Sequence, residues 1–209
     1  MTRRLRHAAW VLAAALLAAA AGAESGGAWR PGGKTEGDGY AFQVFSREDA
    51  AGLVVYQARG RIEAAPDVLV DAVWAVMSDP ESAPEGQTRR VVERGESGFV
   101  VYTHIDLPAL FSDRDIVTRG ASVAAATPGG RRIDWEAIAH DAAPPVDGAI
   151  RIERSAGFWD FAPDGPGSLL VYETYVDLGG SLPDWIVQPL MGGMIGDTVE
   201  DVARRALEP

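Results

Sequence analysis

The stretch FSDRDIVTR, Phe111 to Arg119, places three consecutive charges where a β-strand is expected to begin. Its second half, DIVTR, contains the β-branched residues that favour strands. Successive side chains of a strand point to opposite faces, so Arg114 cannot share a face with Asp113 or Asp115. One face of the sheet must therefore accept a charge. We expect Arg114 to point inward and the two aspartates to lie on the outer or end-facing side.

The segments around this stretch predict an α+β fold. The runs AFQVFSRED and GLVVYQARGRIE have hairpin-like spacing, and AAPDVLVDAVWAVMSD has apolar residues at helical spacing, with Pro66 in the first turn. Gly/Pro turns then separate strand-like segments that predict a long antiparallel meander. These segments are Arg89–Arg94, Gly98–Leu107, Asp115–Val123, Arg131–His140, Ala149–Arg154, Phe158–Phe161 and Leu169–Asp177.

A long helix is predicted at the C-terminus. After Ser181, a suitable N-cap, apolar residues recur at helical spacing as far as Ala206. Pro189 and the pair Gly192-Gly193 interrupt this helix near its middle, and each favours a kink or local loosening. One amphipathic helix covers only part of a large sheet. The remaining concave face must therefore be filled by side chains or enclose a cavity.

The first 23 residues have the pattern of a secretory signal peptide. Three arginines precede an apolar run, which is followed by the small-residue sequence Ala21-Gly22-Ala23. We predict cleavage after Ala23 and a periplasmic or secreted protein, with an uncleaved membrane anchor as the alternative. Residues 24–39 are Gly-rich and polar and are predicted to form a flexible tether. Residues 40–209 are predicted to form one domain.

The chain is acidic, and its negative charge argues against binding to nucleic acid or to anionic membranes. Removing residues 1–23 takes away three arginines and no acid, so the net charge moves from −11 to −14. Such a surface is repelled by nucleic acid and by anionic lipid headgroups. The chain has no cysteine, so an exported form must be stable without disulfides. We expect a monomer that does not bind nucleic acid.

Four segments in order resemble the START lipid-binding domain, a branch of the helix-grip superfamily. They are Val100–Arg119, Pro144–Pro163, Leu169–Trp185 and the closing helix. The matching motifs are Pro108 with Arg114-Asp115, Gly148 to Arg151, Gly157 to Trp159, and Gly180 with Leu182-Pro183.

The resemblance implies a curved antiparallel sheet wrapped around the long C-terminal helix, with an internal hydrophobic tunnel. It also implies that the tunnel binds one lipid, for transport or sensing in the bacterial envelope, and that the last helix acts as a lid. Candidate ligands are a phospholipid, a fatty acid, a hopanoid and a sterol-like molecule, with transient membrane contact during transfer.

Arg114 corresponds to the buried arginine that the resemblance implies. It is expected either to orient a ligand headgroup in the tunnel or to form a purely structural ion pair. A buried charge requires a partner, and the candidate acids are Asp106, Glu136, Glu173 and Asp177. Arg151 has the same two interpretations, of which the structural one is favoured.

Large or flexible side chains are the candidates for the tunnel wall, with ordinary core packing as the alternative for each. They are Tyr102, Trp135, Tyr172, Trp185, Met191 and Met194. The alternation in Gly98–Leu107 places Tyr102 and His104 on one face of the strand. The opposite face is the more apolar one, and the pattern does not establish which face lines the tunnel.

We predict no catalytic site, no metal and no cofactor. His104 and Asp106 lie two residues apart on one strand face, but the sequence shows no third ligand beside them. The chain has no nucleophile elbow, phosphate loop or dinucleotide fingerprint. The alternative is a cyclase, aromatase or hydratase that uses the same cavity, with Glu136, Glu173, His104 and Tyr102 as candidate groups. A non-catalytic accessory or scaffold domain is a further alternative.

Overall fold

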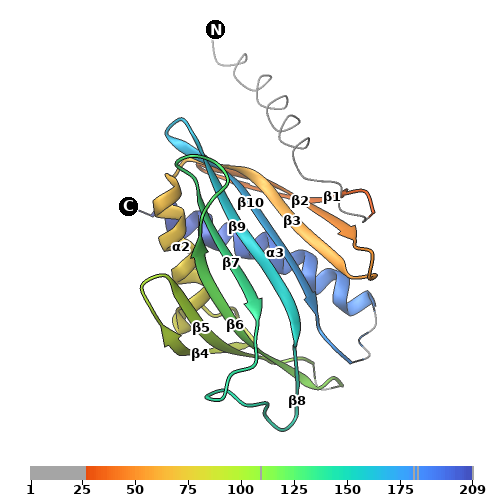
Figure 1. The fold of residues 1–209 in the computed structure, drawn as a ribbon. Coiled ribbons are helices and arrows are strands. Elements are labelled where there is room, and N and C mark those ends of the chain that lie inside the picture. Colours follow the sequence, from red (N-terminus) through yellow and green to blue (C-terminus); the bar gives the residue numbers. More distant parts are fainter. Residues whose placement is uncertain (1–26, 109, 181, 183, 209) are drawn as a thin grey trace.

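A computed structural model describes residues 27–108, 110–180, 182 and 184–208, without the side chains of residues 184–186, 188–190 and 192. The predictions for the signal peptide, residues 1–23, and for Ser181 as an N-cap lie outside the described residues. In the part that is described, one sheet of ten strands curves around a long C-terminal helix (Figure 1). The predicted α+β helix-grip architecture is confirmed.

The described residues form ten strands, and the turn signals predict the order of all of them except β1. They are β1 (Arg30–Gly37), β2 (Tyr40–Glu48), β3 (Val54–Ile62), β4 (Gln87–Arg94), β5 (Gly98–Ile105), β6 (Asp113–Val123), β7 (Arg131–Ala137), β8 (Ala149–Arg151), β9 (Arg154–Asp164) and β10 (Gly167–Asp177). The order across the sheet is β1-β2-β3-β10-β9-β7-β6-β5-β4, and β8 pairs with the start of β6 in parallel. The other pairings are antiparallel, as a meander requires.

Strand β1 corrects the prediction of a flexible tether at residues 24–39. Arg30–Gly37 pairs antiparallel with β2, from Arg30 opposite Ser46 to Gly37 opposite Tyr40, with a shift of register between Pro31 and Lys34. The strand is mostly exposed at the edge of the sheet, so its sequence has no buried alternation to reveal it. Backbone hydrogen bonds to β2, rather than burial of side chains, define it.

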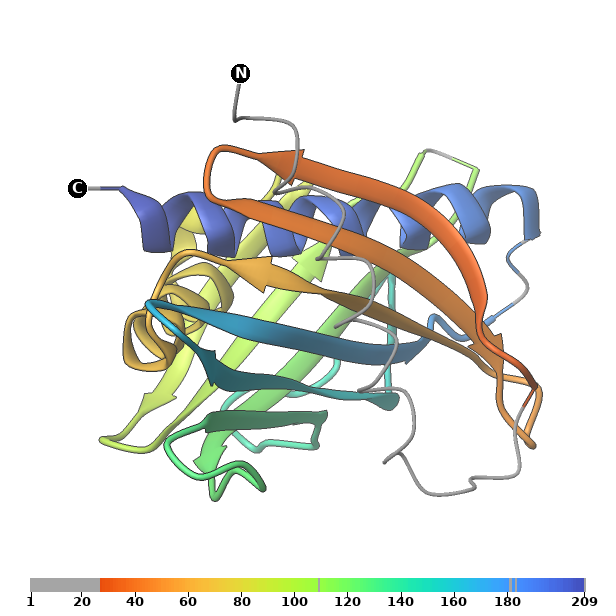
Figure 2. The same ribbon diagram turned by 90° about the horizontal axis from the view of Figure 1, so that it is seen from above.

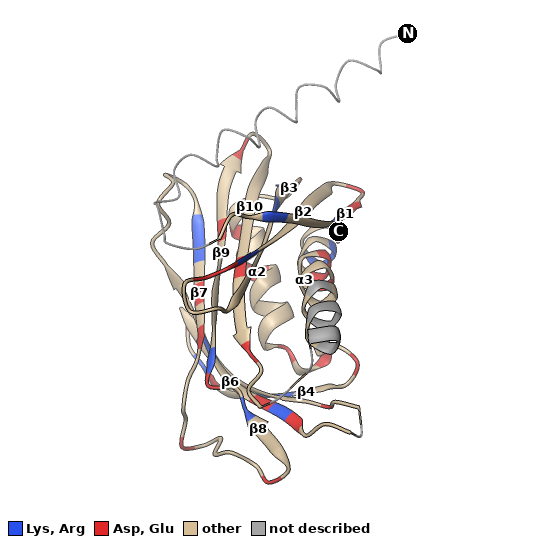
Figure 3. Ribbon diagram, turned by 90° about the vertical axis from the view of Figure 1, so that its right-hand side faces the viewer, with Lys and Arg blue, Asp and Glu red and all other residues tan. Residues whose placement is uncertain are grey.

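Two helices lie within the curve of the sheet (Figures 2 and 3). Helix α2 (Pro66–Ser78) begins with Pro66 in its first turn, as predicted, and is followed by the short helix η2 (Pro80–Ser82). Helix α3 (Asp184–Leu207) is one continuous helix, so the predicted interruption at Pro189 and Gly192-Gly193 does not divide it. None of the described helices is long and apolar enough to cross a membrane.

The main core lies between the helices and the inner face of β2, β3, β7, β9 and β10. Helix α3 contributes Met191, Ile195, Val199, Val202 and Ala203, each at most 2% exposed. This core fills the space between α3, α2 and the sheet. Val187 and Met194, from the N-terminal half of α3, also pack against it.

Candidate ligand-binding cavity

A cavity of about 250 Å³ lies between α3 and the inner faces of β4, β5 and β6. Its apolar lining includes Val101, Ile105 and Ile116 from the strands and Met191 from the helix. Val76 and Met77 of α2 and residues of β7, β9 and β10 complete its wall. The apolar lining makes it the candidate ligand-binding site.

The alternation of β5 and β6 establishes which strand faces line the cavity. Val101, Thr103 and Ile105 of β5 lie opposite Thr118, Ile116 and Arg114 of β6, and all six line the cavity. The cavity is therefore lined by the more apolar face of β5, which the sequence pattern alone did not establish. Tyr102 and His104 lie on the opposite, outer face.

Trp135 and Tyr172, two of the candidate ligand-binding residues, line the cavity. The ring of Tyr172 stacks on Trp159, with 4.0 Å between centroids, and burial raises the pKa of the Tyr172 hydroxyl. Gly157 leaves room for the Trp135 ring and for the backbone of β10, because a Cβ at this position would lie 2.7 Å from that ring and 2.1 Å from the carbonyl oxygen of Glu173. The Gly-x-Trp motif therefore makes room for one aromatic wall residue and supplies a second aromatic ring behind it.

The two candidate methionines of α3, Met191 and Met194, also line the cavity. Met191 is 2% exposed and Met194 is half-buried. The hydroxyl of Thr198 donates to the carbonyl oxygen of Met194 at 2.6 Å, a bond of the kind that bends helices slightly. The flexible thioether side chains provide a surface that can adapt to an apolar guest. The prediction for Trp185 concerns a side chain outside the described part of the chain.

Arg114 points inward, as predicted, and lines one end of the cavity at 2% exposure. Its guanidinium binds four backbone carbonyls from two connections of the chain. Nε donates to Leu178 at 2.6 Å and Nη2 donates to Gly179 at 3.0 Å, while Nη1 donates to Ser112 and, at 3.3 Å, to Asp113. Burial lowers the pKa of Arg114, and the nearby Asp113 carboxylate opposes this shift.

The predicted carboxylate partner of Arg114 is wrong for all four candidate acids. They have other partners: Asp177 binds Arg154, Glu136 lies near Arg119, Glu173 accepts from Gln57 and Asp106 lies beside His104. Carbonyl oxygens instead compensate the buried guanidinium. Arg114 thereby joins the β5–β6 connection to the connection that leads into α3. Gly179 and Gly180 adopt φ values of +64° and +66°, which only glycine adopts readily.

Arg151 and Tyr102 do not line the cavity, contrary to the predicted ligand site. Arg151 forms a bidentate pair with Asp115 on the outer face, at 2.8 Å from each carboxylate oxygen. Asp115 is fully buried, because β8 and the segment ending at Ala143 cover it. These arginine hydrogen bonds are the main reason that the pKa of Asp115 is lowered. Of the two interpretations of Arg151, the structural pair is correct.

Arg89 is a cavity residue that the sequence analysis missed. Arg89 lies on β4, opposite Thr103 of β5, and its guanidinium donates to the carbonyl oxygens of Val76 and Ser82. Burial lowers the pKa of Arg89, and the carboxylates of Asp201 on α3 and of Asp79 oppose this shift. In the sequence, Arg89 is one of two adjacent arginines on a strand with exposed neighbours, so nothing distinguishes it. The cavity therefore has an arginine at two places, each held by backbone carbonyls.

The four groups considered for an enzyme lie outside the cavity. His104 and Tyr102 project from the outer face of β5, and Glu136 and Glu173 line an open groove of about 470 Å³ on the outer side of β7, β9 and β10. That groove is also lined by charged residues such as Arg132 and Asp134.

Neither a scan against protein-family models nor a search of curated proteins returns a match to the sequence. Solved structures do match. A STAR-related lipid transfer protein from Xanthomonas axonopodis superposes with a TM-score of 0.70 at 22% identity, over 86% of this chain and 99% of that one. Human StAR-related lipid transfer protein 5 gives 0.65 at 20%, over 94% and 92% of the two chains. Human STARD10 gives 0.66 at 17%, over 93% and 78%.

The chain has the START fold. The three matches cover 86% to 94% of this chain. The motifs that resemble the START domain lie at the following places in the fold. Arg114 and Asp115 open β6, Gly157 and Trp159 lie on β9, and Gly180 precedes α3. In this START fold, the inward arginine and the outward aspartate each contribute to a separate buried polar network.

Proposed function

We propose that the protein binds a single hydrophobic ligand in the cavity beneath α3 and carries it, or reports its presence, in the bacterial envelope. The observation that carries this proposal is the mainly apolar cavity between β4–β6 and the side of α3 that presents Met191 and Met194. The START fold supports it, since solved structures with this fold include proteins described as lipid transfer proteins. The signal-peptide pattern of residues 1–23 supports the location.

Size and lining restrict the ligand. A volume of about 250 Å³ lies just below the ~300–1,000 Å³ of typical ligand pockets. A single-chain or compact apolar molecule therefore fits with little rearrangement, whereas a two-chain phospholipid requires α3 to move outward. Burial of apolar surface drives binding at ~25 cal/mol per Å². The guanidinium groups of Arg89 and Arg114 lie beside the ligand and favour a polar group that accepts hydrogen bonds.

Entry requires an opening, and α3 is the element suited to provide it. Gly193 is exposed with no atom within 4 Å of its Cβ position, and glycine weakens the helix there. The β5–β6 connection beside the cavity exposes Leu110 at 91%. We propose that this apolar tip makes brief contact with a neutral lipid surface while α3 is displaced. The acidic net charge disfavours lasting attachment to anionic membranes.

The test is a pair of tryptophan substitutions on the same helix. Met194→Trp places a large ring in the cavity, whereas Asp197→Trp places it at an exposed position. Uptake of a fluorescent single-chain fatty acid by the mature protein, residues 24–209, is expected to fall at least tenfold for Met194→Trp and to stay within twofold for Asp197→Trp. Circular dichroism establishes that both variants are folded. Equal uptake by the two variants, or no uptake by the unsubstituted protein, contradicts the proposal.

A further inference from the structure

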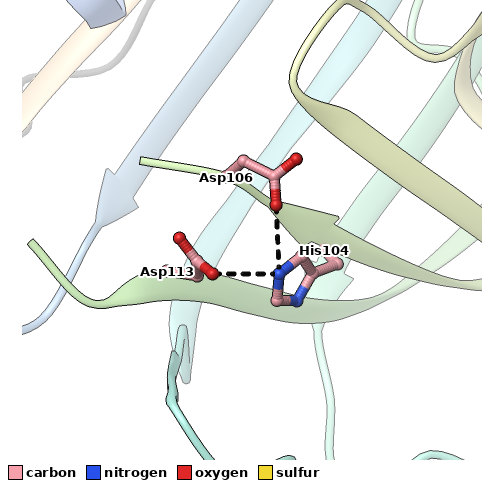
Figure 4. Close-up of side chains that lie close together, drawn as sticks. All are labelled: His104, Asp106 and Asp113. Atoms are coloured by element: carbon pink, nitrogen blue, oxygen red, sulfur yellow. Dashed lines mark ion pairs between the residues drawn. The ribbon is translucent and has the colours of Figure 1, made fainter. Parts of the chain in front are cut away.

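His104, Asp106 and Asp113 bring three metal-binding atoms together where β5 ends and β6 begins (Figure 4). The Nε2 atom of His104 lies 3.3 Å from Oδ1 of Asp106 and 3.4 Å from Oδ2 of Asp113. All three ligand atoms lie within 4.8 Å of one another. Asp113 is the third ligand that the sequence did not reveal, and the pairing of β5 with β6 supplies it.

The spacing fits a shared cation better than hydrogen bonds. Charge-assisted N–H···O bonds are ~2.7–2.9 Å long, and both contacts of His104 exceed that range. One ring nitrogen also has at most one proton for two carboxylates. By contrast, a tetrahedral zinc site with Zn–N and Zn–O bonds of ~2.0–2.2 Å places neighbouring ligand atoms about 3.3–3.5 Å apart. The distances from His104 to Asp106 and to Asp113 match that spacing.

The surroundings of the three residues also suit a cation. A backbone hydrogen bond fixes the orientation of the Asp113 carboxylate. Its Oδ1 accepts from the N–H of Leu107 at 3.0 Å, so that Oδ2 is directed at His104. Metal-binding carboxylates commonly have such an outer partner. The side chains of His104, Asp106 and Asp113 are 27%, 64% and 38% exposed, so an ion can reach them and solvent can fill the remaining positions. The exposed Asp106 can rotate to close the triangle.

We propose that His104, Asp106 and Asp113 form a binding site for a divalent transition-metal ion, with Zn²⁺ as the probe. One imidazole and two carboxylates form a donor set that suits Zn²⁺, whereas Mg²⁺ and Ca²⁺ prefer oxygen ligands alone. The ion links the end of β5 to the start of β6 and so restrains the connection that carries Leu110. The proposal does not depend on which ligand occupies the cavity.

The chain offers a matched control for this site. His140 lies 2.9 Å from Glu93, an ordinary histidine–carboxylate pair on the same protein. Among the described residues, His140 is not part of a group of three side chains that could hold a metal ion. His140→Gln therefore removes a surface histidine and an acid contact without removing the proposed site.

The experiment is calorimetric titration of chelator-treated mature protein, without an affinity tag, with zinc chloride. We expect one Zn²⁺ per chain, with Kd at least tenfold weaker in His104→Gln and in Asp106→Asn and changed less than twofold in His140→Gln. Melting temperatures without metal show whether each variant is folded. Hydrogen exchange is a second readout, because Zn²⁺ is expected to slow exchange in the β5–β6 connection only where the site is intact. No saturable binding by the unsubstituted protein, or equal weakening by His140→Gln, overturns the proposal.

Discussion

Arg114→Lys tests whether the buried arginine stabilises the connection between β10 and α3. The lysine ammonium is a single point and cannot reach both the Leu178–Gly179 carbonyls and the Ser112–Asp113 carbonyls. At least two of the four bonds are therefore lost. Hydrogen bonds to charged groups contribute ~1.5–3 kcal/mol each, but the released carbonyls lie in connections that water can reach. We expect the free energy of unfolding to fall by about 2–4 kcal/mol.

The assay is urea unfolding, with Arg154→Lys as the control. Arg154 pairs with Asp177 at 3.3 Å, on the same side of the fold, but its side chain is 58% exposed. Such pairs contribute ~0–1 kcal/mol, so the control is expected to change little. Hydrogen exchange in the segment before α3 is expected to accelerate in Arg114→Lys alone. If the two variants are equally stable, the four hydrogen bonds of Arg114 do not stabilise the fold as we infer.

Asp115→Asn leaves Arg151 with an uncompensated buried charge, and urea unfolding is expected to show a loss of about 3–5 kcal/mol. Because the folded pKa of Asp115 lies below its ordinary value of 3.8, its stabilisation is complete above that value and is lost as the pH falls through the folded pKa. Acid titration of the difference between wild type and Asp115→Asn measures this, and a pH-independent difference contradicts it. Gly157→Ala is expected to destabilise the protein, since its Cβ meets backbone at 2.1 Å. Gly193→Ala, with open space around it, is expected to stabilise α3 by up to ~1 kcal/mol and to slow ligand uptake. If thermal melts show that Gly157→Ala is more stable than Gly193→Ala, the roles assigned to these two glycines are wrong.

The sequence was sufficient to predict the order of the elements. Turn signals separate β4 to β10, and the helical spacing after Ser181 predicts α3, because alternation and helical periodicity are local properties. Strand β1 was missed because it is exposed on both faces and has no alternation. Its existence depends on pairing with β2, which is not local.

The partners of the charged residues could not be predicted, for a related reason. The inward direction of Arg114 follows from strand alternation alone, but its four carbonyl partners come from two connections whose backbone path no pattern specifies. Asp115 and Arg151 meet because β8 pairs in parallel with β6, a three-residue contact too short to read from sequence. The position of Arg89 at the cavity likewise depends on tertiary packing.

The central claim is that the cavity beneath α3 holds one apolar ligand. Native mass spectrometry of the mature protein after incubation with a mixture of single-chain and two-chain lipids tests it most directly. We predict one bound molecule per chain, with single-chain lipids preferred, and loss of that complex in Met194→Trp but not in Asp197→Trp. A spectrum that shows only the unliganded chain at every lipid concentration contradicts the claim.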